Sequence, residues 1–251
     1  LPDLSFKKAQ SDVKKFMSWL QELKEVKPEE ITYDESLTRE ILIWEMENQT
    51  KAHNFFWLNI PIAVYSSPIP NINRVFTEFK LEQEKNLQQY LNLLIQYPTI
   101  IDEVMARLKH QLQKKIVLPG AALGLPGYYL SSIIQPADKS IFFVRKNRLQ
   151  AFVQNLPKIS EFQQNVANIV TNSLNPKLKK LLSFIQGEYA KEAPDRVGLW
   201  QYPGGKDYYE FLVKYNTSLD LNPAEIHKIG LREIKNLLEK MDKIRQHLKF
   251  D

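Results

Sequence analysis

The sequence predicts an all-α fold, and three features of its residues support that prediction. Apolar residues recur at spacings of three and four through most of the chain, as they do on the buried face of a helix. Only 8 glycines occur in 251 residues, where average usage would give roughly 17 or 18. Cap residues precede several apolar stretches. We therefore expect residues 1–251 to form one irregular multi-helix domain with two loops that contain glycine and proline.

The first half of the chain predicts four long amphipathic helices. Ser5 and Asp34 are expected to cap the first two, because their side chains can accept a free backbone N–H group. Pro98 is expected to separate the last two, since proline removes an interior backbone donor. The four expected helices cover residues 6–23, 34–55, 73–96 and 101–116.

The second half predicts shorter helices around two stretches rich in glycine and proline. Ser160 with Gln163 fits a capping box, and Asn222 followed by Pro223 and Glu225 indicates a strong helix start. The glycine and proline stretches are residues 118–127 and 193–206. The expected helices cover 128–135, 147–155, 160–174, 177–190, 208–215 and a final segment from 222 onward.

Composition excludes several classes of protein. The net charge is +5, but lysines are mixed with glutamates, which indicates a solvated surface rather than a nucleic-acid partner. The absence of cysteine excludes disulfides and cysteine-based zinc or nucleophilic sites. The longest apolar stretch, residues 55–65, is too short to span a membrane and contains Asn59 and Pro61. The compartment stays open, with a cytoplasmic and an exported protein both compatible.

No catalytic or metal-binding residue is predicted in this chain. A helical zinc site needs two ligands one turn apart, and the four histidines show no such spacing. The pattern Gly-x-Ser-x-Gly is absent. Gly204-Gly205-Lys206 differs from a phosphate loop, because Trp200 stands where the first glycine is needed and Asp207 replaces the serine or threonine.

The two glycine and proline stretches are the candidates for ligand binding, since loops on a rigid scaffold often carry binding residues. The alternative is that glycine and proline simply end helices there. Aromatic residues accompany the second stretch, and tyrosine offers both an apolar ring and a hydroxyl. They suit a pocket for a peptide or small ligand, and they equally suit a helix-packing core. These aromatic residues are Trp200, Tyr202, Tyr208, Tyr209 and Tyr215.

One segment of the chain resembles a diagnostic block of the DUF885 family. The segment, residues 198–234, reads GLWQYPGGKDYYEFLVKYNTSLDLNPAEIHKIGLREI. It has the block's proline-glycine turn, tyrosine-containing helix, threonine turn and capped helix with Glu225-Ile226-His227. A weaker resemblance covers YLNLLIQYPTIIDEVMARLKHQLQKKIVLP. Tyr215 and Asn216 stand where the family often has a histidine, so a role for that histidine does not carry over.

The resemblance implies the amino-terminal helical half of a zinc metallopeptidase that acts on short peptides. The family's His-Glu-x-x-Pro-Gly-His motif is expected beyond Asp251, so zinc belongs to the intact protein and not to this chain. The implied partners are a peptide substrate and a missing carboxy-terminal catalytic half. The chain is then a fragment, or it is a naturally short non-catalytic relative. The rival function is a non-catalytic helical binding or interaction module.

We expect residues 118–127 and 198–209 to converge and to line the substrate cleft of the full protein. Tyr202 and Tyr209 are candidates to donate a hydrogen bond to the substrate or to a developing oxyanion. The alternative, in which both belong to the core with satisfied hydroxyls, stays open. The expected substrate-binding residues are Tyr202, Gly204, Gly205, Tyr208, Tyr209, Tyr215 and Thr217.

Overall fold

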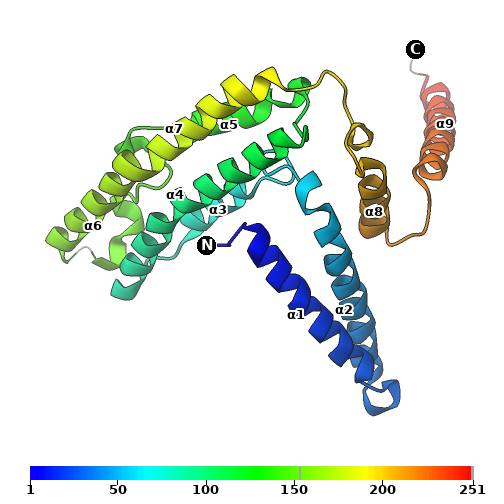
Figure 1. Ribbon diagram of the computed structural model, residues 1–251, viewed down its shortest axis with the longest axis horizontal. Coiled ribbons are helices and arrows are strands. Elements are labelled where there is room, and N and C mark those ends of the chain that lie inside the picture. Colours follow the sequence, from blue (N-terminus) through cyan, green and yellow to red (C-terminus); the bar gives the residue numbers. More distant parts are fainter. Residues whose placement is uncertain (153, 250–251) are drawn as a thin grey trace. The chain divides into compact units, whose positions relative to one another are not determined.

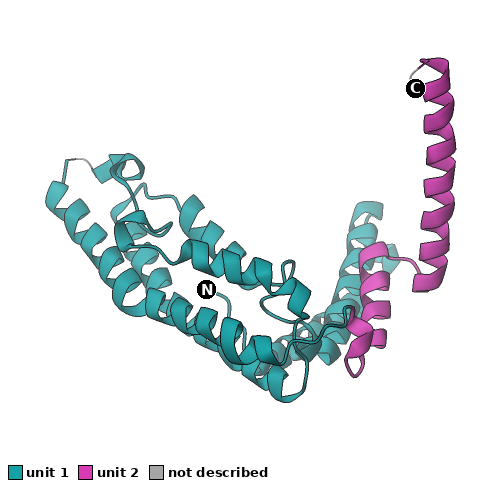
Figure 2. Ribbon diagram, turned by 90° about the horizontal axis from the view of Figure 1, so that it is seen from above, with its two compact units in different colours: residues 1–197 teal, residues 198–251 magenta. Residues whose placement is uncertain are grey.

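The computed structural model describes residues 1–152 and 154–249, and within these ranges α-helices and short 3₁₀ or π turns are the only regular structure (Figure 1). The all-α prediction is therefore confirmed. The chain divides into two compact units, residues 1–197 and residues 198–251 (Figure 2). Within the described ranges, no helix is long and apolar enough to cross a membrane.

Unit 1 begins with two helices, α1 (Phe6–Glu25) and α2 (Tyr33–Ala52), that lie side by side (Figure 1). The Ser5 side chain accepts the backbone N–H of Lys8, so the predicted cap is confirmed. The predicted cap at Asp34 is wrong. Thr32 caps α2, because Thr32 and Glu35 satisfy each other's backbone N–H groups in a capping box.

The next two helices are α3 (Pro68–Glu78) and α4 (Glu84–Gln113). The predicted break at Pro98 is wrong, because Pro98 lies inside α4. Helix α4 continues past this proline without interruption. An interior proline costs about 3 kcal/mol, but buried residues on both sides, among them Leu94 and Ile101, keep the helix against the core. The chain breaks earlier, after α3, where Nη2 of Arg148 donates to the carbonyls of Phe76 and Phe79 at 3.2 and 2.8 Å.

The second half of unit 1 holds α5 (Gly124–Ile133), α6 (Leu156–Ile169) and α7 (Asn175–Phe184). A π turn, η7 (Val170–Leu174), joins α6 to α7 without a break, and a second, η8 (Ile185–Tyr189), extends α7. The expected separation at Asn175 and Pro176 is therefore wrong. A π turn changes the backbone hydrogen-bond spacing, and this allows a proline, which lacks N–H, to follow directly.

Two further sequence expectations change in this region. The cap of α6 is Asn155, whose side chain accepts the backbone N–H of Lys158 at 3.1 Å, so the capping box predicted at Ser160 and Gln163 is wrong. Short 3₁₀ turns, η5 (Lys146–Arg148) and η6 (Gln150–Phe152), occupy most of the helix expected over 147–155. Residue 153 of that expected helix lies outside the described residues.

The core of unit 1 is an aromatic cluster around α4. Tyr90 and Tyr97 of α4 pack with Phe76 and Phe142, with ring centroids 5.3 to 5.8 Å apart. All four side chains are fully buried. Burial raises the pKa of both tyrosines, because their ionised forms would lose hydration. The Tyr90 hydroxyl is paired, donating to the carbonyl oxygen of Phe142 at 2.6 Å.

Unit 2 contains α8 (Gly205–Thr217) and α9 (Pro223–His247), after a short 3₁₀ turn, η9 (Leu199–Gln201). The predicted start of α9 is confirmed, since Asn222 and Glu225 form a capping box. No described residue of α9 is buried. Most of its large apolar side chains are instead exposed, namely Ile229, Leu231, Ile234, Leu237, Leu238, Met241 and Ile244.

Replacing Tyr90 by Phe is expected to lower the free energy of unfolding by about 1–3 kcal/mol, because the buried Phe142 carbonyl loses its donor. Chemical denaturation of the purified chain measures this change. The matched control is Tyr65→Phe, since Tyr65 is fully exposed. Equal stabilities of the two variants would show that the Tyr90 hydroxyl does not hold the core together.

Candidate functional site

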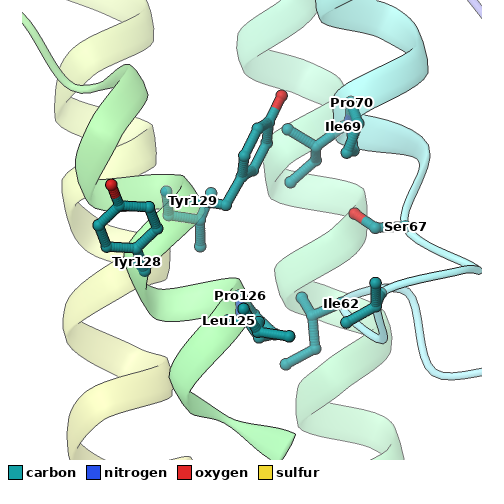
Figure 3. A pocket seen from close by; sticks show the side chains of 10 residues that line it. Ile62, Ser67, Ile69, Pro70, Leu125, Pro126, Tyr128 and Tyr129 are labelled. Atoms are coloured by element: carbon teal, nitrogen blue, oxygen red, sulfur yellow. The ribbon is translucent and has the colours of Figure 1, made fainter. Parts of the chain in front are cut away.

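An apolar pocket in unit 1 is the site best suited to hold a ligand. Its cavity volume is about 260 Å³. This is below the range of about 300–1,000 Å³ that is typical of drug-sized ligands, so the pocket suits one side chain of a larger ligand. It is lined by Ile62, Val64, Ser67, Ile69, Pro70, Leu125, Pro126, Tyr128, Tyr129 and Leu130 (Figure 3).

One wall of the pocket is the loop between η2 (His53–Leu58) and α3. Side chains of α4 hold this loop: Nη2 of Arg107 donates to the Asn59 carbonyl at 2.7 Å, and Nε2 of Gln111 donates to it at 3.2 Å. Within the loop, the Ser66 hydroxyl donates to the Ile60 carbonyl at 2.6 Å. The wall is therefore fixed by hydrogen bonds before any ligand arrives.

The other wall is α5, which follows the 3₁₀ turn η3 (Gly120–Ala122). Much of the glycine and proline stretch expected as a loop over 118–127 is thus helical. The Tyr189 hydroxyl accepts the Leu118 N–H at 2.8 Å, and the Pro194 carbonyl accepts the Gly120 N–H at 3.1 Å. The predicted stretch 118–127 therefore supplies pocket residues, and these residues lie on a short helix that hydrogen bonds hold in place.

Three polar side chains form a relay behind the pocket. The Tyr97 hydroxyl donates to Oδ1 of Asn73 at 2.7 Å, and Nδ2 of Asn73 donates to the Tyr129 hydroxyl oxygen at 2.7 Å. Tyr97 is fully buried and Asn73 is 4% exposed, whereas Tyr129 is only partly buried and lines the pocket. The relay thus links the centre of unit 1 to a residue that lines the pocket.

Burial of Tyr97 decides which way the hydrogen bonds in this relay point. If the Asn73 amide were reversed, the Tyr97 hydroxyl would accept a hydrogen bond and its own proton would be left unpaired inside the core. An unpaired buried donor costs about 1–3 kcal/mol. Tyr129 is only partly buried, so an unpaired hydroxyl proton costs less there than at Tyr97. The observed direction is therefore favoured, and it leaves the Tyr129 proton free to be donated.

The tyrosines expected to bind substrate lie in unit 2 and differ in exposure. Tyr202 is 6% exposed, and burial raises its pKa to about 12. Tyr209 is 50% exposed on α8. Tyr208 and Tyr215 are half-buried, and each stacks on Phe211, with ring centroids 6.5 and 5.9 Å apart. The structure thus places one of the two proposed hydrogen-bond donors, Tyr202, among buried side chains.

Gly204 and Gly205, also expected at the substrate site, have a backbone reason to be glycine. Gly204 has a φ of 73° in the left-handed region, directly before α8. A Cβ atom on Gly205 would lie 1.7 Å from the Leu199 carbonyl oxygen, so the start of α8 packs directly on η9. This pair therefore builds the turn between η9 and α8.

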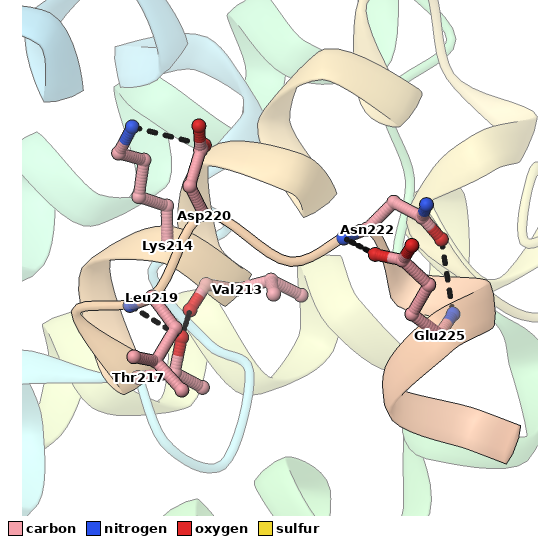
Figure 4. A network of polar contacts seen from close by, with 7 residues as sticks. All are labelled: Val213, Lys214, Thr217, Leu219, Asp220, Asn222 and Glu225. Atoms are coloured by element: carbon pink, nitrogen blue, oxygen red, sulfur yellow. Dashed lines mark hydrogen bonds and ion pairs between the residues drawn. The ribbon is translucent and has the colours of Figure 1, made fainter. Parts of the chain in front are cut away.

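Thr217 belongs to the polar network at the turn between α8 and α9 (Figure 4). Its hydroxyl donates to the Val213 carbonyl at 2.7 Å and accepts the Leu219 N–H at 3.2 Å. Lys214 and Asp220 form an ion pair at 3.0 Å beside it. Thr217 thus ends α8, and this accounts for a threonine at this point of the chain.

The histidines and acidic residues of the described ranges are spread over the chain. These ranges contain no group of three or more histidine, cysteine, aspartate or glutamate side chains that could hold a metal. The His53 ring stacks on Phe6 at 5.3 Å, and the His110 ring lies 4.0 Å from Trp57. His227 and His247 lie on α9, twenty positions apart.

Sequence reasoning did not identify most of the pocket. Tyr128 and Tyr129 were expected only as part of a helix, and Ile62 and Ile69 lie between two expected helices. The glycine and proline stretch ending at Gly127 pointed to one wall of the site, whereas the segment that carries Pro68 and Pro70 was not singled out. Nothing in the sequence brings these two segments together, because their contact depends on the tertiary packing.

Comparison with known proteins identifies one family and one fold. No curated protein matches the chain. A solved structure, described as the putative lipoprotein from Colwellia psychrerythraea, aligns with a TM-score of 0.83 at 16% sequence identity. The alignment covers 98% of this chain and 44% of that chain, so this chain spans less than half the length of that protein. At this identity the likeness shows the fold alone.

The family described as "Bacterial protein of unknown function (DUF885)" matches residues 1–251. This match covers every element described above, including the pocket in unit 1 and the α8 and α9 segment in unit 2. The chain therefore belongs to the DUF885 family.

Proposed function

We propose that this chain is the substrate-holding helical part of a zinc metallopeptidase that acts on short peptides, and that it does not catalyse by itself. The observation that carries the proposal is the apolar pocket between the η2–α3 loop and α5. Its size suits a single apolar side chain, and its rim is open, with Leu125 64% and Tyr128 76% exposed. Exposed apolar surface of this kind often marks a binding site.

The exposed apolar face of α9 supports the proposal that this chain packs against a further part of the whole protein. Ile234, Leu237, Met241 and Ile244 follow each other at spacings of three and four, and Leu238 widens the stripe. A stripe of this width is typical of a helix in a multi-helix core. The similar solved chain is more than twice as long as the aligned region, which leaves room for such a part.

The rival proposal is a helical binding module without catalysis. The pocket is compatible with it, because binding an apolar side chain needs no metal or nucleophile. The two proposals differ in what accompanies the pocket in the whole protein, and they make opposite predictions for metal content and hydrolysis.

The pocket is expected to bind the tripeptide Gly-Leu-Gly and to bind Gly-Asp-Gly at least tenfold more weakly, because an apolar wall cannot replace the hydration of a carboxylate. Leu125→Asp is expected to weaken Gly-Leu-Gly binding by a similar factor. The control is Ile95→Asp, since Ile95 is 58% exposed and does not line the pocket. Calorimetric titration measures these affinities. Equal binding of both tripeptides would contradict the proposed occupant.

The protein expressed from its whole coding sequence is expected to contain one zinc ion and to hydrolyse short peptides, whereas residues 1–251 alone hydrolyse none. Metal analysis and a peptide hydrolysis assay test both statements. Reading the coding sequence past Asp251 gives the same discrimination. A downstream His-Glu…His motif supports the peptidase, and a stop codon directly after Asp251 supports the binding module.

We also propose that Tyr209 contacts substrate in the whole protein, while Tyr202 has a structural role. Tyr209→Phe is expected to lower kcat/KM with little change in melting temperature, because Tyr209 is half-exposed. Tyr202→Phe is expected to do the reverse, since Tyr202 is buried. Thermal denaturation and peptide hydrolysis separate the roles. A lower melting temperature and unchanged turnover for Tyr209→Phe would show that Tyr209 does not contact substrate.

A further inference from the structure

We propose that Tyr129 donates its hydroxyl proton to a carbonyl oxygen of the ligand whose apolar side chain fills the pocket, an inference that rests on the proposed function. The ligand class is thereby narrowed to an apolar amino-acid side chain flanked by an uncharged carbonyl, as in a peptide. Tyr129 lines the pocket, and its ring extends toward the segment that carries Ile69 and Pro70 (Figure 3).

Three constraints make Tyr129 a donor in a defined direction. Its oxygen already accepts Nδ2–H of Asn73 at 2.7 Å, and its hydroxyl proton has no acceptor within the described residues. Asn73 cannot reverse to take that proton, because Oδ1 is held by the buried Tyr97 hydroxyl at 2.7 Å. A carbonyl oxygen on the ligand would satisfy the proton, whereas an N–H group in the same place would oppose it.

The other hydroxyls that line the pocket are not held in this way. Ser67 can rotate and both donate and accept, so it imposes no preference between a ligand N–H and a ligand carbonyl. Tyr128 is 76% exposed, and its ring is turned away from that of Tyr129 (Figure 3). Selection for a carbonyl therefore rests on the relay that ends at Tyr129.

Two probes separate the hydroxyl from the apolar pocket. N-acetyl-L-leucinamide has the apolar side chain and flanking carbonyls, and toluene has an apolar ring without an acceptor. Binding of each probe to the purified chain is measured by calorimetric titration or by NMR shifts. Tyr129→Phe is expected to weaken N-acetyl-L-leucinamide about three- to tenfold and to leave toluene unchanged. Tyr33→Phe is the matched control, since Tyr33 is 81% exposed and does not line the pocket, and it is expected to change neither affinity.

Tyr97→Phe provides an independent test, because Tyr97 does not line the pocket. Without the Tyr97 hydroxyl, the Asn73 amide can reverse and accept the Tyr129 proton, which then is no longer available to the ligand. We expect a loss of N-acetyl-L-leucinamide affinity close to that of Tyr129→Phe, with toluene again unchanged. Melting temperatures show whether each variant is folded. If Tyr97→Phe does not fold, the result for Tyr129→Phe alone decides the proposal.

The outcomes distinguish this proposal from the proposed function on which it rests. If the wild-type chain binds toluene and N-acetyl-L-leucinamide, and Tyr129→Phe binds both as well as the wild type does, the donor role is overturned while the apolar site stands. If the wild-type chain binds neither probe, the pocket is not a ligand site, and both proposals are overturned. Full affinity in Tyr97→Phe together with a loss in Tyr129→Phe would overturn the role of the relay.

Discussion

Two tyrosine hydroxyls that α4 carries into the centre of unit 1 are shielded from water, so each must be paired within the protein. Tyr90 pairs with the Phe142 carbonyl and thereby holds the segment between α5 and α6 against α4. Tyr97 pairs with Asn73, which fixes α3 on the same helix. Asn73 then reaches Tyr129 and connects α3 to α5. The need to pair a buried hydroxyl in the core therefore couples the two walls of the pocket.

This coupling gives the pocket its chemical character. Hydrogen bonds from Arg107 and Gln111 hold one wall, and those from Leu118 and Gly120 hold the other. A ligand that enters such a site need not order the loops around it, and this lowers the entropic cost of binding. Between the walls lie apolar side chains and the Tyr129 phenol. The buried Tyr97 hydroxyl, acting through Asn73, sets the hydrogen-bond direction of this phenol. The site thus combines non-specific attraction for an apolar group with one directed polar contact.

The sequence predicted the fold class and several helix ends, because both depend on local patterns. Ser5 and the Asn222–Glu225 box act within one turn, and the structure shows both. Pro98 was misjudged, since the burial of α4 on both sides of it depends on residues far along the chain.

The site was less predictable than the fold. The glycine and proline of residues 118–127 pointed to one wall of the pocket, but Asn73 and Tyr97 looked like ordinary helix residues. Their relay joins residues separated by 24 and 56 positions, and no local pattern encodes such a contact. The glycines at 204 and 205 were expected at the substrate site, and backbone geometry at the start of α8 accounts for glycine at both positions.

The central claim of this account is the direction of the hydrogen bonds between Tyr97, Asn73 and Tyr129. Neutron diffraction from a deuterated crystal of the chain would locate the exchangeable hydrogens directly. The account predicts a deuteron between the Tyr97 oxygen and Oδ1 of Asn73, another between Nδ2 of Asn73 and the Tyr129 oxygen, and the Tyr129 deuteron facing the pocket. A Tyr129 deuteron that lies on the line to Asn73 would contradict it.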